Sequence, residues 1–78
     1  MHLTIITPDK QVFDGEVEMA SFPGSDGSFQ ILNNHAPLIS ALKAGNIRLK
    51  FEDDSEESFT IKGGVVEVLN NKMLVLAE

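Results

Sequence analysis

NIRLKF, residues Asn46–Phe51, decides the fold of this chain. Polar and apolar side chains alternate along it without interruption, and successive side chains of an extended backbone point to opposite faces. One face of such a strand is buried while the other is in water. Residues 16–19 and 58–62 repeat the alternation. The sequence therefore predicts strands that each contribute one face to a common core.

Outward from this stretch, turn-forming residues separate about nine short strand-like runs. Asp53-Asp54 is expected to close a hairpin between residues 47–51 and residues 58–62. Asn70-Asn71 suits a tight turn between the last two runs, because asparagine tolerates the positive φ angles that such turns need. Both pairs of residues predict antiparallel neighbours.

Other residues are expected to interrupt the strands. Pro8–Lys10 and Asp14-Gly15 break the first runs, and only Leu38–Leu42 could form a helical turn, with Gly45 following too soon for a long helix. Many short strands separated by Gly and Pro are typical of a sandwich or barrel. We expect one all-β domain over residues 1–78.

Composition and charge exclude several classes of partner. The chain has 78 residues and a net charge of −6, and its six basic residues are scattered. Binding to phosphates needs a basic patch, so nucleic acid is not expected. An anionic membrane surface repels an acidic chain, and no apolar stretch approaches the ~20 residues that a membrane span needs, so direct membrane insertion is not expected. With no cysteine, a disulfide framework and a thiolate metal site are excluded. A core this small is often stabilised by a partner.

No residue pattern predicts catalysis, a metal or a cofactor. His2 and His35 are the two histidines, and no H-E-x-x-H-like spacing supplies the further ligands that zinc needs. A triad of Ser25 or Ser28 with His35 and Asp26 can be imagined, but the spacing gives it no support.

The glycine-rich and acidic stretches have ordinary structural interpretations. Gly24–Gly27 lacks the lysine of a phosphate-binding loop. Gly64 is expected to let two backbones approach closely. The acidic run over residues 52–57 does not fit a calcium loop and is expected to be a solvated hairpin tip.

Several segments, in the family's order and spacing, together resemble the epsilon subunit of the F-type ATP synthase. They cover nearly the whole chain: residues 7–9, 12–17, 23–29, 34–45, 63–68 and 75–78. The most specific is the His-Ala-Pro-Leu block at 35–38, followed by the turn that ends at Gly45. The resemblance implies a flattened antiparallel β-sandwich of short strands. A C-terminal helical hairpin follows it in most members but is not expected in a sequence that stops at Glu78, whether it is naturally short or truncated.

The resemblance also implies a function. The chain would be a non-catalytic subunit of the central stalk that helps couple proton-driven rotation to ATP synthesis, peripheral to the cytoplasmic face of a bacterial inner membrane. Its partners would be the gamma subunit and the membrane rotor ring, with no cofactor, metal or nucleotide bound by this chain. The residues expected to lie near gamma are Asn34, His35, Ala36, Pro37 and Leu38. The residues expected to lie near the ring are Ser25, Asp26, Gly27, Ser28 and Phe29.

Two other classes of protein fit the sequence less well. An unrelated small β-sandwich that binds protein or carbohydrate is the main alternative, but carbohydrate sites usually display aromatic platforms, and the chain has no Trp or Tyr. A small hydrolase would need a nucleophile–base pair that the sequence does not supply. Co-purification with a gamma subunit would distinguish the first interpretation from both alternatives.

Overall fold

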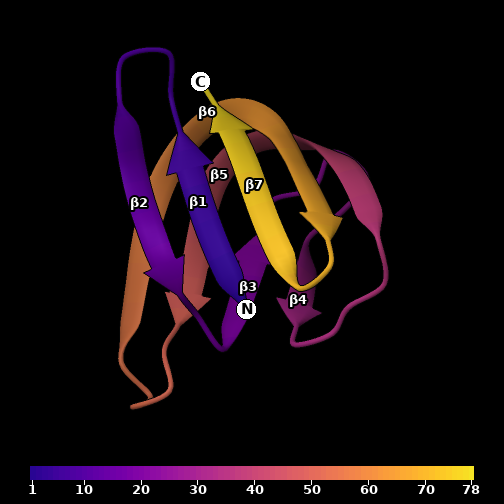
Figure 1. The fold of residues 1–78 in the computed structure, drawn as a ribbon. Helices are drawn as coiled ribbons and strands as arrows, with labels where there is room; N and C mark the ends of the chain where they lie inside the picture. The colour runs from indigo at the N-terminus through magenta and orange to yellow at the C-terminus, as the bar shows by residue number, and fades with distance from the viewer.

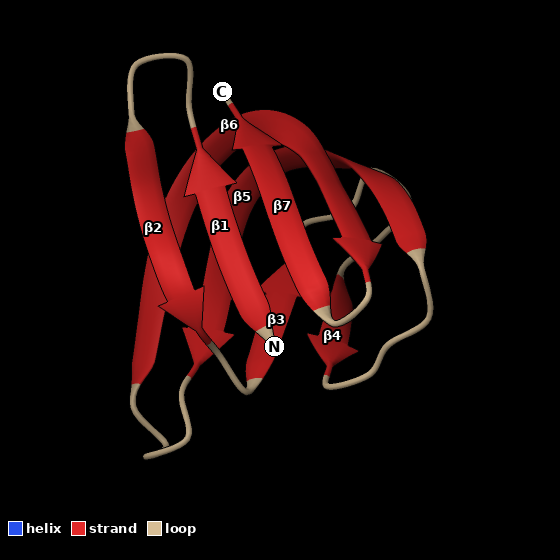
Figure 2. Cartoon of the chain, in the orientation of Figure 1, coloured by secondary structure: helices blue, strands red, loops and turns tan.

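The computed structural model describes residues 1–78 and contains seven strands joined by turns and loops (Figures 1 and 2). They are β1 (His2–Ile6), β2 (Gln11–Glu16), β3 (Met19–Phe22), β4 (Phe29–Leu32), β5 (Leu38–Lys50), β6 (Glu56–Leu69) and β7 (Lys72–Ala77). They form one sheet in the order β2-β1-β7-β6-β5-β3-β4. The all-β prediction is confirmed. No helix in the structure is long and apolar enough to cross a membrane.

The single sheet becomes a sandwich because its two longest strands bend. β5 and β6 are 13 and 14 residues long and pair with each other along nearly their whole length. Beyond the bend each strand continues into the other layer, so that the hairpin arches over the top of the molecule (Figure 1). The front layer contains β2, β1, β7 and the halves of β6 and β5 at 64–69 and 38–43. The back layer contains the remaining halves, β3 and β4.

Glycine at the bend permits a close approach of two backbones, as the sequence suggested for Gly64. A Cβ atom on Gly64 would lie 2.3 Å from the carbonyl oxygen of Leu76 on β7, which is inside any real contact distance. The segment after β3 also joins β5 here, since Gly24 bridges to Leu42 and the backbone N–H of Lys43 donates to the carbonyl of Pro23 at 2.8 Å. The bend is therefore fixed by backbone contacts.

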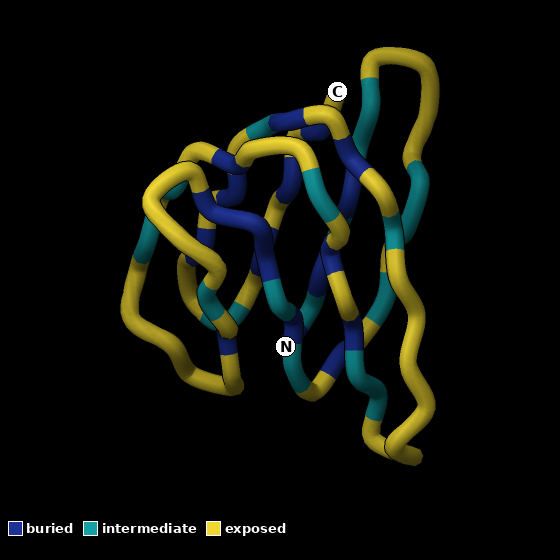
Figure 3. Tube along the Cα trace, turned by 180° about the vertical axis from the view of Figure 1, so that it is seen from behind, coloured by how far each residue is buried: buried dark blue, intermediate teal, exposed yellow.

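The core lies between the two layers and is entirely apolar. Alternate side chains of each strand point inward: Leu3 and Ile5 from β1 and Val75 from β7 meet Ile47 and Leu49 from the back half of β5. No polar or charged residue is buried. The open side of the sandwich is closed by three phenylalanines, because the ring of Phe13 on β2 lies 6.1 Å from Phe51 and 5.8 Å from Phe59, centroid to centroid. Buried and exposed residues alternate along the strands in Figure 3.

Both predicted hairpin turns are confirmed. Asp54 has φ +68° in the β5–β6 turn, and Asn70 and Asn71 have φ +52° and +60° in the β6–β7 turn. Asparagine and aspartate adopt these left-handed angles more readily than other non-glycine residues. Turn-forming residues therefore determine where both hairpins reverse direction.

Four expectations about the strands were wrong. There are seven strands and not nine, because β5 and β6 are continuous where several short runs were expected. Leu38–Leu42 is the first half of β5 and not a helical turn, since its pairing with β6 overrides local propensity. Asp14-Gly15 lies inside β2 and does not break it. One neighbouring pair, β1 with β7, is parallel, although the other pairs are antiparallel as predicted.

Candidate docking surfaces

The two loops singled out in the sequence lie at opposite ends of β4. Residues 25–28 precede this strand and residues 33–37 follow it. A strand rises about 3.3 Å per residue, so the four residues Phe29–Leu32 hold the two loops roughly 10 Å apart or more. Loops displayed on a rigid sheet are common positions for binding residues. The two loops are therefore separated by the length of β4.

The stretch expected near gamma is exposed but ordered by local contacts. Asn34, His35, Ala36 and Pro37 are exposed and Leu38 is half-buried at the start of β5. Asn34 has φ +63°, and its backbone N–H donates to the side-chain oxygen of Asn71 at 2.8 Å. Nδ1 of His35 lies 2.7 Å from the carbonyl oxygen of Ala36. The ring of His35 therefore remains in solvent and available to a partner.

The stretch expected near the ring is also an exposed loop. Residues 25–28 are exposed, while Phe29 is half-buried with its ring 5.6 Å from that of Phe22. The backbone N–H of Ser25 donates to the carbonyl of Ala41 at 3.0 Å, and that of Gly27 donates to the carbonyl of Gly24 at 3.0 Å. The loop is thus hydrogen-bonded to β5 at Ser25 and packed against the core at Phe29.

A third surface was missed in the sequence: an apolar face on the outside of the front layer. We define the apolar face as the exposed side chains of Ile39, Val65, Leu69, Leu74 and Leu76. Their strands are neighbours, and Val65 lies directly opposite Leu76 while Ile39 and Leu74 both lie opposite Glu67. Their exposed fractions range from 39% to 71%. Among the exposed large apolar side chains, only Leu32 on β4 lies elsewhere.

The sequence carries a signal for this face in the strands β6 and β7. β7 is KMLVLA and the end of β6 is VVEVL, so both strands have apolar residues on both sides. A strand of this kind is typical of a sheet that is covered on both faces. Within this chain only one face of each strand is covered, by the back layer.

A shallow hollow connects the predicted gamma stretch with the apolar face. It has a volume of about 410 Å³. Its lining comes from the start of β5 and the end of β6: Pro37, Leu38, Ile39, Glu67, Val68 and Leu69. Residues 37–38 therefore belong to a continuous surface with Ile39 and Leu69.

Polar side chains of β1 and β2 border the apolar face. Thr4, which pairs with Leu74, donates its hydroxyl to the carboxylate of Asp14 at 2.8 Å, and Nε2 of His2 lies 2.6 Å from the same oxygen. The hydrogen bond from Thr4, and then that from His2, lowers the pKa of Asp14 from its ordinary value. This border is a hydrogen-bonded cluster of side chains beside the β2 edge of the sheet.

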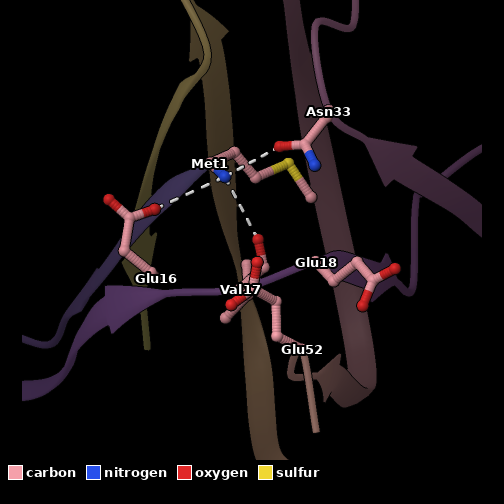
Figure 4. A pocket seen from close by; sticks show the side chains of 6 residues that line it. All are labelled: Met1, Glu16, Val17, Glu18, Asn33 and Glu52. Atoms are coloured by element: carbon pink, nitrogen blue, oxygen red, sulfur yellow. Dashed lines mark hydrogen bonds and ion pairs between the residues drawn. The ribbon is translucent and has the colours of Figure 1, made fainter. Parts of the chain in front are cut away.

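The N-terminal ammonium group is held in a second hollow, of about 420 Å³ (Figure 4). It donates to the carbonyl of Val17 at 3.2 Å and to the side-chain oxygen of Asn33 at 2.8 Å, and it lies 3.4 Å from the carboxylate of Glu16. Glu18 and Glu52 complete the lining. The described chain has no group of three or more His, Cys, Asp or Glu side chains arranged to hold a metal ion. The hollow therefore orders the start of the loop at residue 33.

The family model for the β-sandwich domain of the ATP synthase delta/epsilon chain matches residues 1–78. The chain belongs to this family. The ATP synthase epsilon chain of Chlorobium limicola is 53% identical over 76 residues, covering 97% of this chain and 86% of that one. The epsilon chain of Brevibacillus brevis is 37% identical over 78 residues, and the match covers 59% of its length.

Solved structures show the same fold. A chain in the mitochondrial ATP synthase of Euglena gracilis superimposes with a TM-score of 0.90 over 96% of this chain and 48% of that chain, at 19% identity. A chain in the central stalk and c-ring of the Tetrahymena thermophila enzyme superimposes with a TM-score of 0.81 at 23% identity. The superposition covers 61% of the length of that chain.

Membership of the family makes this chain a non-catalytic ATP synthase subunit of the epsilon type.

Proposed function

We propose that this domain is a mechanical connector in the central stalk of a bacterial ATP synthase, at the cytoplasmic face of the membrane. It binds the gamma subunit on one surface and the membrane rotor ring on another, and it rotates with both. Rotation of the ring is thereby transmitted to gamma and used for ATP synthesis. The domain contributes stiffness and contact area, and no chemical step occurs on it.

The observation that carries this proposal is the surface that joins the apolar face to Pro37 and Leu38, at the end of the stretch expected near gamma. Clustered exposed apolar side chains mark interaction surfaces on soluble proteins, and here five large ones lie on three neighbouring strands. The Tetrahymena thermophila chain that shares the fold comes from an assembly of central stalk and c-ring. Gamma is the occupant that we assign, because the stretch matched to its contacts runs directly into the hollow beside Ile39 and Leu69. Glu67, in the middle of the face, is placed to pair with a basic residue of gamma.

The loop at residues 25–28 lies at the other end of β4 and suits a polar surface. Its side chains are two serines and one aspartate beside a glycine, and all four residues are exposed. Small hydrogen-bonding residues of this kind can contact the polar loops of a ring without burying a large apolar area. We assign this loop, with Phe29 as its anchor in the core, to the ring.

A titration with purified gamma tests the first contact. Ile39→Ser should weaken binding about tenfold, as for a side chain near the centre of an interface. Leu32→Ser is the matched control, because Leu32 is 57% exposed but lies on β4, away from the apolar face. Leu32→Ser should bind gamma with the affinity of the unaltered chain. Equal affinities for both variants would contradict the assignment of the apolar face to gamma.

Activity of the assembled enzyme tests the ring contact. Replacing Ser25 and Ser28 with lysine should leave ATP hydrolysis by the catalytic head intact while proton pumping falls, since the change lies at the joint between rotor parts. Asp26→Ala alone should do little, because an exposed ion pair contributes about 0–1 kcal/mol. If pumping and hydrolysis both survive the double replacement, the loop does not face the ring.

A further inference from the structure

We propose that Asn71, in the turn between β6 and β7, is a positioning residue that holds the loop at residues 33–37 in the shape that binds gamma. The inference rests on the proposed function, because it takes this loop to be part of the gamma surface. Asn71 itself need not contact gamma. It is 37 residues away from Asn34 in the sequence and belongs to none of the segments expected to touch a partner.

The geometry places Asn71 at a junction of three segments. Its side-chain oxygen accepts the backbone N–H of Asn34 at 2.8 Å. Its backbone carbonyl accepts the N–H of His2, the first residue of β1, at 3.2 Å. Asn71 is half-buried, although the residues on both sides of it, Asn70 and Lys72, are exposed. The side chain is therefore directed at the loop and the backbone at the sheet.

The contact falls on a residue whose conformation needs support. Asn34 has φ +63°, in the left-handed region that non-glycine residues adopt uncommonly. The hydrogen bond from its N–H stabilises this conformation and directs the chain toward His35. The remaining bond within the loop is the short contact between Nδ1 of His35 and the carbonyl of Ala36.

A second tether fixes the residue before Asn34. The side-chain oxygen of Asn33 accepts a hydrogen bond from the N-terminal ammonium at 2.8 Å, and that group is itself held by Val17 and Glu16 (Figure 4). Two consecutive residues are thus anchored to two different parts of the sheet. An exposed loop that is ordered before binding loses less conformational entropy when a partner covers it.

Substitutions in this turn can remove the hydrogen bond between Asn71 and Asn34 without changing the fold. Asn71→Gly removes the side-chain acceptor but keeps the left-handed angle of φ +60°, and Asn-Gly is itself a favoured sequence for this type of turn. Asn70→Gly is the matched control, because Asn70 lies in the same turn with φ +52° but makes no hydrogen bond to the loop. Asn71→Asp restores an acceptor at the same position and should rescue the effect.

Two measurements on the full chain decide the inference: amide hydrogen exchange of Asn34 by NMR, and affinity for purified gamma. In Asn71→Gly, the amide of Asn34 should exchange roughly tenfold faster and the affinity should fall about three- to tenfold, as expected for loss of one hydrogen bond that orders an interface loop. The thermal midpoint should stay near that of the unaltered chain. Asn70→Gly should change neither quantity, and Asn71→Asp should recover both.

Each other outcome has a definite meaning. Unchanged exchange at Asn34 in Asn71→Gly would overturn the tether. Faster exchange with unchanged affinity for gamma would overturn the positioning role. If the unaltered chain itself failed to bind gamma, the proposed function would be wrong, and the exchange of the Asn34 amide would still show separately whether Asn71 orders the loop.

Discussion

The two outer faces of this sandwich are built by the same two strands and have opposite character. In the front layer, β5 and β6 direct Ile39, Val65 and Leu69 outward. In the back layer, beyond the bend, the same strands direct polar side chains outward, and β3 and β4 add Ser21 and Gln30, with Leu32 as the one large apolar side chain exposed there. We call this the polar face: Ser21, Gln30, Asn46, Arg48, Ser58 and Thr60.

The contrast between the two faces shows when alternation of polar and apolar residues identifies a solvent-exposed side of a strand. On the polar face, side chains pair with one another, as Thr60 does when its hydroxyl donates to the side-chain oxygen of Asn46 at 2.8 Å. On the apolar face, alternation fails at Ile39, Val65, Leu69, Leu74 and Leu76, which are apolar although they point outward, while Glu67 between them is polar. Failure of alternation within a two-layered domain therefore points to a surface that another protein covers.

The largest effect is expected where the two faces are separated, at Gly64. Gly64→Ala should destabilise the domain by about 3 kcal/mol or more, because the new methyl group would overlap the backbone of Leu76 and that backbone cannot rotate away. Gly15→Ala is the control, since its Cβ would meet only the tip of the Phe13 ring at 3.3 Å. Urea unfolding measures both variants. A Gly64→Ala domain as stable as the unaltered one would show that the bend tolerates a side chain.

A smaller effect separates the inside from the outside of β7. Val75 is 0% exposed and the adjacent Leu76 is 53% exposed. Val75→Ala should cost about 2 kcal/mol through lost burial and the cavity that it leaves, whereas Leu76→Ala should change the free energy of unfolding by less than about 0.5 kcal/mol. Thermal unfolding of the isolated domain is the measurement. Similar losses for both variants would mean that the apolar face is covered already, for instance by a second copy.

The pH dependence of stability should reveal the polar border of the apolar face. The folded-state pKa of Asp14 is lowered, so its contribution is present above the unfolded pKa and is lost as the pH falls through the folded value. Between neutral pH and about pH 4 the contribution should be constant, and below about pH 4 it should disappear. Asp14→Asn should lose less stability than the unaltered chain over that acid range. Urea midpoints at pH 7, 4 and 2.5 provide the check, and parallel curves for the two proteins would refute the linkage.

The smallest effect is expected on the polar face. Arg48 and Glu56 are exposed, and their charged groups lie 3.5 Å apart. Such a pair contributes about 0–1 kcal/mol, so Arg48→Gln should change stability by less than about 0.5 kcal/mol. It should also leave gamma affinity unchanged. A marked loss of affinity in this variant would move the docking surface to the back layer.

Much of the fold followed from local sequence. Asn46–Phe51 alternates cleanly and is a strand with Ile47 and Leu49 buried, and Asn70-Asn71 forms the turn that its residues favour. Leu38–Leu42 was misread, because its strand conformation depends on pairing with residues 64–68. The parallel contact of β1 with β7 joins the two ends of the chain and has no local signature.

The candidate surfaces were only partly visible in the sequence. The loops around Asp26 and His35 could be located from their turn residues and from the family resemblance, and which partner each loop contacts stays a prediction. The apolar face could not be distinguished from a buried strand, since KMLVLA reads the same whether a second layer or another protein covers it. The contact of Asn71 with Asn34 spans 37 residues and requires the fold to be known.

The most direct test of the central claim is an NMR titration of the isotopically labelled chain with unlabelled gamma subunit. The amide signals of Ile39, Val65 and Leu74, together with those of residues 34–38, should shift or broaden most. The amides of Asn46, Arg48 and Thr60 on the polar face should stay unchanged. The largest changes on the polar face, with the apolar face unaffected, would contradict the account.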